Sequence, residues 1–94
     1  MEEKLAQMAQ LVHTIAQALV DRPQEVHVRG IEGAYTMVLE LHVAKEDVGK
    51  VIGRQGRTAQ AIRILVGAVS AKINRRTLLE IIDKNHPAGP QLRN

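Results

Sequence analysis

The sequence has no cysteine, no tryptophan and no phenylalanine, and Tyr35 is its only aromatic residue. Without cysteine, the chain can form neither a disulfide nor a thiolate metal site. Proteins that read nucleic acid by stacking bases on aromatic side chains, as RNA-recognition motifs and OB-folds do, need a platform that this chain lacks. The hydrophobic core must therefore be built from aliphatic side chains.

Long apolar runs are also missing. No stretch approaches the roughly 20 apolar residues of a membrane-spanning helix, and residues 1–4 carry two acids where a secretory signal would carry bases. A chain of 94 residues suffices for one domain. We therefore expect a cytoplasmic protein with no membrane partner, with a single domain over residues 1–83 and a flexible tail over residues 84–94.

Acidic residues are absent from positions 48–79, although this segment holds seven of the thirteen basic residues. All ten acidic residues and the other six basic ones lie outside it. Such a basic segment indicates a polyanionic partner, or else a solvated basic helix face. The four histidines show no metal-ligand spacing, and no nucleophile–base pair or cofactor loop is present. We therefore expect no metal, no cofactor and no enzymatic activity.

The first half of the chain predicts one helix and two strands. Apolar residues at helical spacing predict a helix over residues 3–20, which ends before Pro23. Alternation of apolar and polar residues predicts a short strand around residues 26–28 and a second strand over residues 35–43. The glycine-containing segment 30–33 reads as the turn between them, and the glutamates of both strands are expected to point outward.

The second half predicts two helices and a strand. A helix of about two turns covers residues 46–52, and a longer one begins after Gly56 and ends before residue 74. The apolar face expected for the longer helix consists of Ile62, Leu65, Val66, Val69 and Ile73. Residues 77–83 are nearly all apolar and predict a strand buried on both faces. Two glycines inside these helices, Gly49 and Gly67, suggest close helix packing.

The most informative stretch is Val51-Ile52-Gly53-Arg54-Gln55-Gly56-Arg57. Glycine has no Cβ, so another backbone can approach it closely and its φ can be positive. A helix that begins after the second glycine directs unpaired N–H groups and the positive end of its dipole at the loop. Because Arg54 and Arg57 add full positive charge there, the loop is suited to a phosphate. The alternative is a purely structural turn.

Two further features remain open. Ala61, Ile64 and Ala68 form a second stripe on the long helix, and Ile64 lies about 200° around the helix from Ile62. These residues either pack against the sheet or the first helix, or they form a face for a partner or for the bases of a nucleic acid. The pair Arg75-Arg76 is either a second phosphate contact or a solvated helix end.

The glycine loop and its surroundings resemble the signature of KH domains. That signature is an apolar pair, Gly-x-x-Gly and then a helix, and it matches here as Val51-Ile52-Gly53-Arg54-Gln55-Gly56 with Ala59 and Ile62 downstream. The α-β-β-α-α-β order resembles the type II (prokaryotic) KH topology, an α+β fold in which helices pack on one side of a three-stranded sheet. Nearly the whole chain before the tail, and residues 46–63 above all, resembles small bacterial stand-alone KH proteins of the KhpA type.

The resemblance implies that the chain binds single-stranded RNA, with the Gly-x-x-Gly loop holding the backbone of about four nucleotides. The residues expected to contact RNA are Gly53, Arg54, Gln55, Gly56 and Arg57, with Lys50 and Arg63 added from charge and spacing. The residues expected to support the loop or the groove are Val51, Ile52 and Ile62. Many KH domains carry a larger aliphatic at the position of Ala59 and a lysine at that of Gln60, so no base preference is predicted.

Two functions remain open. The first is an RNA-binding module that acts as a post-transcriptional regulator or RNA chaperone. The second is a KH-fold protein–protein interaction or dimerisation module with little RNA binding. The resemblance also implies pairing with a second copy, or with a larger KH-containing bacterial protein, which would join two weak clamps and raise their avidity.

Overall fold

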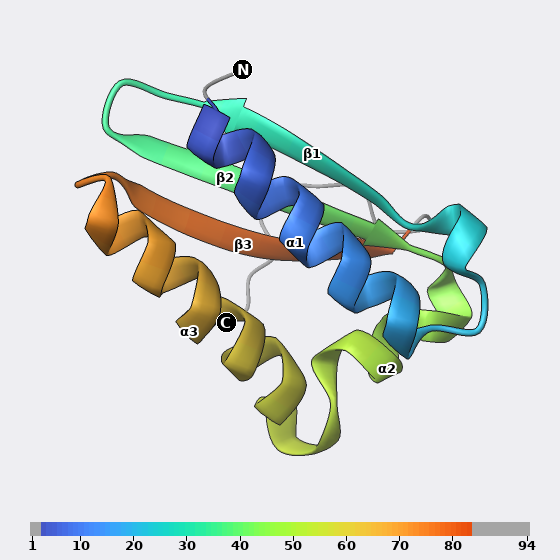
Figure 1. Ribbon diagram of the computed structural model, residues 1–94. Coiled ribbons are helices and arrows are strands. Elements are labelled where there is room, and N and C mark those ends of the chain that lie inside the picture. The colour runs from blue at the N-terminus through green and yellow to red at the C-terminus, as the bar shows by residue number, and fades with distance from the viewer. Residues whose placement is uncertain (1–2, 84–94) are drawn as a thin grey trace.

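The computed structural model describes residues 3–83, which contain three α-helices and a three-stranded sheet (Figure 1). The elements are α1 (Glu3–Leu19), β1 (His27–Glu32), β2 (Thr36–Val43), α2 (Val48–Ile52), α3 (Arg57–Lys72) and β3 (Arg76–Asp83). This is the order that the sequence predicts. The expected flexible tail, residues 84–94, lies outside the described part of the chain.

The sheet is mixed, with β2 in its centre. Strand β1 pairs with β2 in antiparallel register from His27↔His42 to Glu32↔Met37. Strand β3 pairs with the other side of β2 in parallel register, starting at Thr36↔Arg76. Helices α1 and α3 both cover the same face of the sheet (Figure 1). The predicted fold class, an α+β fold with helices on one side of a three-stranded sheet, is confirmed.

The core is aliphatic, as the lack of aromatic residues requires. Every second residue of β2 faces the helices and is fully buried, namely Met37, Leu39, Leu41 and Val43. The buried side chains that meet them from the helices are Leu5, Met8, Val12 and Ala16 of α1, Val51 of α2, and Ile62 and Val66 of α3. Because α2 and α3 both pack into this one core, the segment that joins them is held at a fixed place.

The predicted turn at residues 30–33 is wrong. Strand β1 continues through Gly30 to Glu32, and the chain turns only after that, where the Gly33 N–H donates to the Thr36 carbonyl at 2.9 Å. A Cβ at Gly30 would lie 3.2 Å from the side chain of Leu5. This glycine therefore serves the close packing of α1 on β1, and sequence alone cannot distinguish that role from a turn.

Glu40 lies on the face of the sheet that points away from the helices, as predicted. Its carboxylate is nevertheless buried rather than solvated. Its side chain lies between its cross-strand neighbours Arg29 and Glu80, and its Oε1 lies 3.3 Å from Nε2 of His42. A side chain in the middle strand is covered from both sides, which an isolated strand pattern does not reveal.

Three apolar residues are more exposed than predicted. Tyr35 precedes β2 and is 85% exposed, Leu65 is 49% exposed, and Leu78 of the supposedly doubly buried strand is 39% exposed. Helix α3 packs on the sheet through the narrow stripe of Ala59, Ile62, Val66 and Ser70. Leu65 is turned about 60° from Ile62, away from Val66, and so misses the sheet.

Close helix packing does not account for the two helical glycines. A Cβ at Gly49 or at Gly67 would have no atom within 4 Å among those compared. Both positions face open space, so the prediction of a packing role is wrong for each.

Candidate nucleic-acid interface

The loop between α2 and α3 has an unusual backbone. Three of its four residues have positive φ: Gly53 at 79°, Gln55 at 56° and Gly56 at 75°. Two hydrogen bonds hold the loop: the Gly53 N–H donates to the Gly49 carbonyl of α2 at 2.9 Å, and the Gly56 N–H donates to the Gly53 carbonyl at 3.1 Å. Left-handed residues next to right-handed ones turn successive N–H groups toward one side, which is how backbone concavities bind anions.

The two glycines of the loop are required for different reasons. Gly53 has ψ of 172°, a conformation that is essentially restricted to glycine, and a Cβ there would collide with Oγ1 and Cβ of Thr58. Gly56 is in the left-handed helical region with ψ of 12°, and a Cβ there would meet nothing within 4 Å. Gly53 is therefore required both by its backbone conformation and by its close contact with Thr58. Gly56 is required only by its backbone conformation.

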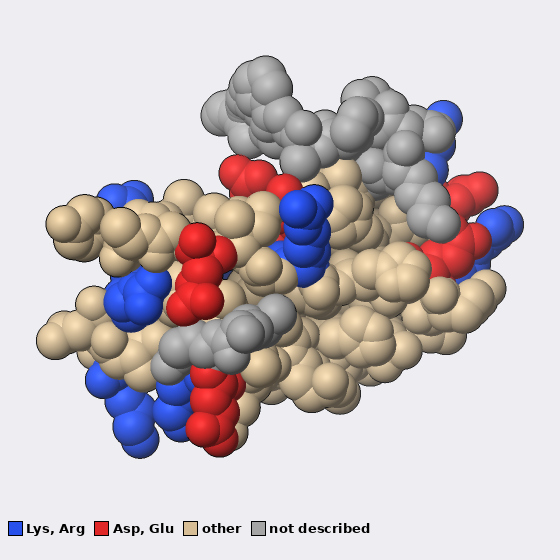
Figure 2. Space-filling view, turned by 90° about the horizontal axis from the view of Figure 1, so that it is seen from above, with Lys and Arg blue, Asp and Glu red and all other residues tan. Residues whose placement is uncertain are grey.

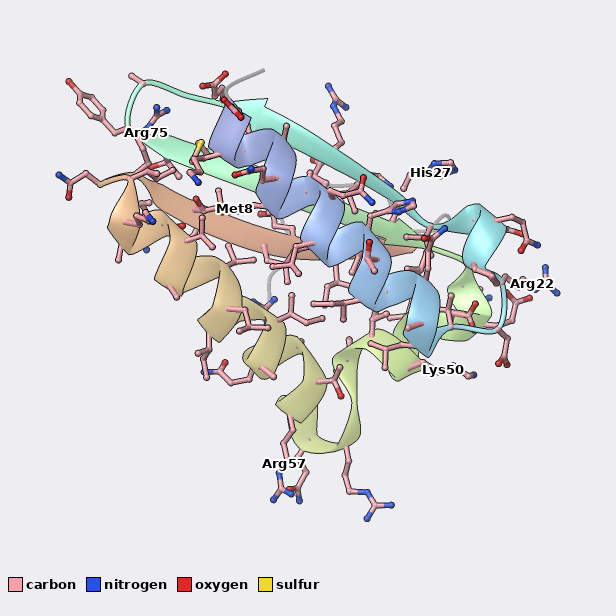
Figure 3. The ribbon with its side chains drawn as sticks, in the orientation of Figure 1. Met8, Arg22, His27, Lys50, Arg57 and Arg75 are labelled. Atoms are coloured by element: carbon pink, nitrogen blue, oxygen red, sulfur yellow. The ribbon has the colours of Figure 1, made fainter. Side chains whose placement is uncertain are left out.

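Positive charge at the loop is free to meet a ligand. Arg54 and Arg57 are exposed, and neither forms an ion pair or a hydrogen bond through its side chain with any other residue in 3–83. Figure 3 shows Arg57 at the tip of the molecule, pointing away from the sheet. Helix α3 begins here with Gly56 as its N-cap and without a side-chain cap. The positive end of its dipole therefore adds to the two guanidinium groups.

The other two cations named from the sequence are engaged with the protein. The ammonium of Lys50 lies 3.4 Å from the carboxylate of Asp21 and 3.7 Å from that of Asp47. The guanidinium of Arg63 donates to the Leu79 carbonyl on β3 at 3.2 Å. The structure thus places Arg63 between α3 and the edge strand, and draws Lys50 toward the end of α1. An RNA contact by either residue stays a prediction.

The residues named as supports of the loop lie at different depths. Val51 is fully buried and Ile62 is 2% exposed, so both belong to the core beneath the loop. Ile52 is 38% exposed and reaches solvent beside the loop. Anchoring of α2 therefore rests on Val51, while Ile52 offers apolar surface next to the arginines.

The named partner face lies at the surface. Ala61, Ile64 and Ala68 are all exposed, Ile64 to 62%, and the neighbouring Leu65 widens the stripe. Of the two interpretations left open, packing against the sheet or against α1 is therefore excluded for Ile64.

The residue that holds the loop-bearing helix in place cannot be recognised from the sequence. Asp47 is only 1% exposed, and its carboxylate accepts hydrogen bonds from the backbone N–H groups of Asp21 at 3.2 Å and Arg22 at 3.0 Å. This carboxylate ties the end of α1 to the start of α2. The sequence shows only an acid in front of a helix, because its partners lie more than twenty residues away.

These contacts make the stability of the fold depend on pH. Burial alone would raise the pKa of Asp47, but the two backbone N–H donors and Lys50 outweigh it and hold the pKa below its ordinary value of 3.8. A carboxyl whose pKa is lowered by folding stabilises the fold above its unfolded pKa, and this contribution is lost as pH falls through the folded pKa.

We therefore expect Asp47→Asn to lower the stability measured by urea unfolding at pH 5, and the difference from wild type to shrink below about pH 4. Asp21→Asn, which removes only an exposed partner of Lys50, is the matched control and should have a small effect at both values. A difference that stays constant from pH 5 to pH 2 would show that the Asp47 charge does not hold α1 to α2.

Residues 3–83 lack two other features. No group of three or more His, Asp or Glu side chains in this part is placed to hold a metal ion. None of the helices within residues 3–83 combines the length and the apolar character that a membrane span requires.

Known proteins are similar in sequence to this chain over most of its length. The RNA-binding protein KhpA of Caldanaerobacter subterraneus subsp. tengcongensis is 56% identical over 75 residues, which cover 80% of this chain and 100% of that protein. The protein of the same name from Clostridium acetobutylicum is 53% identical with the same coverage. That from Borreliella burgdorferi is 53% identical over 74 residues, covering 79% of this chain and 90% of its own.

A solved structure shares this fold, and a family model matches most of the chain. The crystal structure of Aquifex aeolicus Era superposes with a TM-score of 0.55 at 18% identity, over 88% of this chain and 31% of that one, and this likeness shows the fold alone. The model of the KH domain of KhpA and KhpB matches residues 9–81. From this match and the identities above, we conclude that the chain belongs to the KhpA/KhpB family of KH-domain proteins.

Proposed function

We propose that this protein binds single-stranded RNA through the loop Gly53–Gly56 and the start of α3. The observation that carries the proposal is the left-handed loop backbone beside an uncapped helix N-terminus and two arginines without protein partners. The relatives above are named as RNA-binding proteins, which supports the same ligand here.

The geometry favours contacts with the RNA backbone rather than with base edges. Gly53 and Gly56 allow the sugar–phosphate chain to approach the loop. The N–H groups of Arg54 and Gln55, which form no hydrogen bond within the loop, donate to phosphate oxygens, and the two guanidinium groups add charge. The loop and the first turn of α3 hold no aromatic side chain on which bases could stack. We therefore propose a clamp of modest affinity and broad sequence tolerance, used by a cytoplasmic post-transcriptional regulator or RNA chaperone.

Binding should weaken steeply with salt. Neutralising about three or four phosphates should give a slope of roughly −2 to −3 in a plot of log affinity against log salt, since each contact on a single strand contributes about 0.7. We expect Arg57→Ala to make the slope shallower by about 0.7, measured by fluorescence anisotropy of a labelled single-stranded RNA.

Lys45→Ala provides the matched control for this measurement, because Lys45 is exposed but lies in the 3₁₀ turn before α2 rather than at the loop. Its slope should equal that of wild type. A wild-type slope near zero, or an equal loss in both variants, would mean that the loop does not contact the RNA backbone.

The second candidate function is assembly through the outer face of α3. Ile64 is 62% and Leu65 49% exposed, and the adjacent Ala61 and Ala68 keep the surface flat. A contiguous apolar strip of this kind marks interaction surfaces more often than free surface. We propose that it pairs the protein with a second copy or with a larger KH-containing protein, bringing two clamps together.

Ile64→Glu should then yield a folded monomer whose loop is intact. Burying a charge in an apolar contact is unfavourable, whereas at a residue that is already 62% exposed it should leave the fold unchanged. Sedimentation equilibrium should show the loss of the dimer. If wild type is already monomeric at high concentration and remains so with RNA, self-association through this face is contradicted.

A further inference from the structure

The only aromatic side chain lies on the surface, far from the loop. Tyr35 occupies the turn between β1 and β2 and is 85% exposed. The presence of Tyr35 is therefore not explained by core packing, since the core is entirely aliphatic. An exposed ring on a surface turn offers a flat face to a ligand.

Two hydrogen bonds stabilise the turn that carries Tyr35. Nη2 of Arg75 donates to the Gly33 carbonyl at 2.9 Å, and the Gly33 N–H donates to the Thr36 carbonyl at the same distance. Arg75 is itself fixed, because its N–H donates to the Ser70 carbonyl at the end of α3 at 3.1 Å. Arg75 thus links the turn to the junction of α3 and β3, and Figure 3 shows it at the end of α3 opposite to Arg57. The ring of Tyr35 therefore projects from a turn whose backbone is hydrogen-bonded to Arg75.

Two exposed cations, Arg76 and Lys72, lie on the elements next to this turn. Arg76 begins β3 and is the cross-strand neighbour of Thr36, the residue after Tyr35, while Lys72 ends α3. Both are exposed, and neither forms an ion pair with another residue in the described range 3–83. In Figure 2, Lys and Arg side chains gather toward the left end of the molecule, with acidic side chains beside them. Glu32, which ends β1, is the acid nearest to the turn in the chain.

We propose that Tyr35, Arg76 and Lys72 form a second contact for single-stranded RNA, in which a base stacks on the tyrosine ring and the cations hold the adjacent phosphates. This inference rests on the proposed function of the loop and extends its footprint. Helix α3 has 16 residues and so is about 24 Å long. An RNA strand that continues beyond the loop along this helix reaches the turn of Tyr35.

The chemistry of this contact suits a protein without base specificity. Every base has a π-face, so stacking on one tyrosine tolerates any sequence, and a nearby arginine strengthens it. Arg75 acts here as a positioning residue, because its guanidinium is hydrogen-bonded to the turn rather than offered to the ligand.

The intrinsic fluorescence of Tyr35 tests the contact directly. The chain contains no tryptophan and no other tyrosine, so all of its emission reports this one ring. Titration with a single-stranded RNA of about twelve nucleotides should quench the emission, with the midpoint found by anisotropy of the same RNA. Free N-acetyltyrosinamide in the same titration corrects for absorption by the RNA.

Two pairs of variants complete the test. Tyr35→Ala should weaken binding about fivefold, the lower end of the range for one stacked base, whereas Tyr35→Phe should keep wild-type affinity. Arg76→Gln should make the salt slope shallower by about 0.7, and Lys45→Gln, at the far end of β2, should leave it unchanged. Circular dichroism checks that each variant is folded.

Each outcome has a separate meaning for the two proposals. RNA that binds without quenching, together with equal affinity for Tyr35→Ala and wild type, overturns the second contact but leaves the loop clamp standing. Quenching that persists when Arg54 and Gln55 are both replaced by Asp supports the second contact and contradicts the loop as the main clamp. Absence of any RNA binding by wild type overturns both.

Discussion

Replacement of Arg54 and Gln55 together by Asp is expected to lower the affinity for single-stranded RNA on the order of 100-fold. Two carboxylates would then face the phosphates, each repelled by about 1 kcal/mol or more at 4 Å, and the Arg54 contact would be lost as well. The fold should survive, because both side chains are exposed, Asp tolerates the left-handed backbone at position 55, and acids suit a helix N-terminus.

A variant with the same change in net charge separates a local effect from a general one. Gln24→Asp with Lys45→Asp alters two exposed residues in 3₁₀ turns away from the loop. Its RNA affinity should fall by no more than a few-fold, since the change acts only through the overall field. An equal loss of affinity in both double variants, or an unchanged affinity in the loop variant, would contradict the clamp.

Replacement of Gly53 by Ala is expected to destabilise the fold far more than the same change at Gly56. The first substitution combines a backbone conformation that is essentially glycine-only with a collision against Thr58, and should cost about 3 kcal/mol or more. For a domain of this size, that lowers Tm by at least about 12 °C. At Gly56 only the left-handed backbone is unfavourable, so the expected loss is about 1 kcal/mol.

Thermal unfolding of the two single variants measures this difference, and each serves as the control for the other. Equal shifts in Tm would mean that the contact between Gly53 and the start of α3 does not fix the loop. Binding should fall in Gly56→Ala despite its near-normal stability, because the added methyl group occupies the space through which a backbone would approach.

Much of the fold could be predicted from the sequence because the core is regular. The spacing of Leu5, Met8 and Val12 and the alternation of Met37 and Leu39 each state which face is buried. The predictions that are wrong concern short segments whose structure depends on contacts with residues distant in the sequence. Gly30 resembles a turn residue until the position of Leu5 on α1 is known.

The site could be predicted in part for a related reason. The glycine loop is contiguous in sequence, so its two glycines mark its position and permit the positive φ that both of them have. The contacts of Lys50 and the burial of Asp47 depend on the end of α1, which packs beside α2 only after folding. The alternation of apolar residues predicts a strand that includes Tyr35, whereas β2 begins one residue later, at Thr36.

The most direct test of the loop clamp is to follow every backbone amide by two-dimensional ¹H–¹⁵N NMR during titration with a short single-stranded RNA. The clamp predicts the largest shifts at Gly53, Arg54, Gln55, Gly56 and Arg57, with smaller ones along α3. Binding that leaves these five amides unshifted, with the changes confined to other elements, would contradict the proposed site.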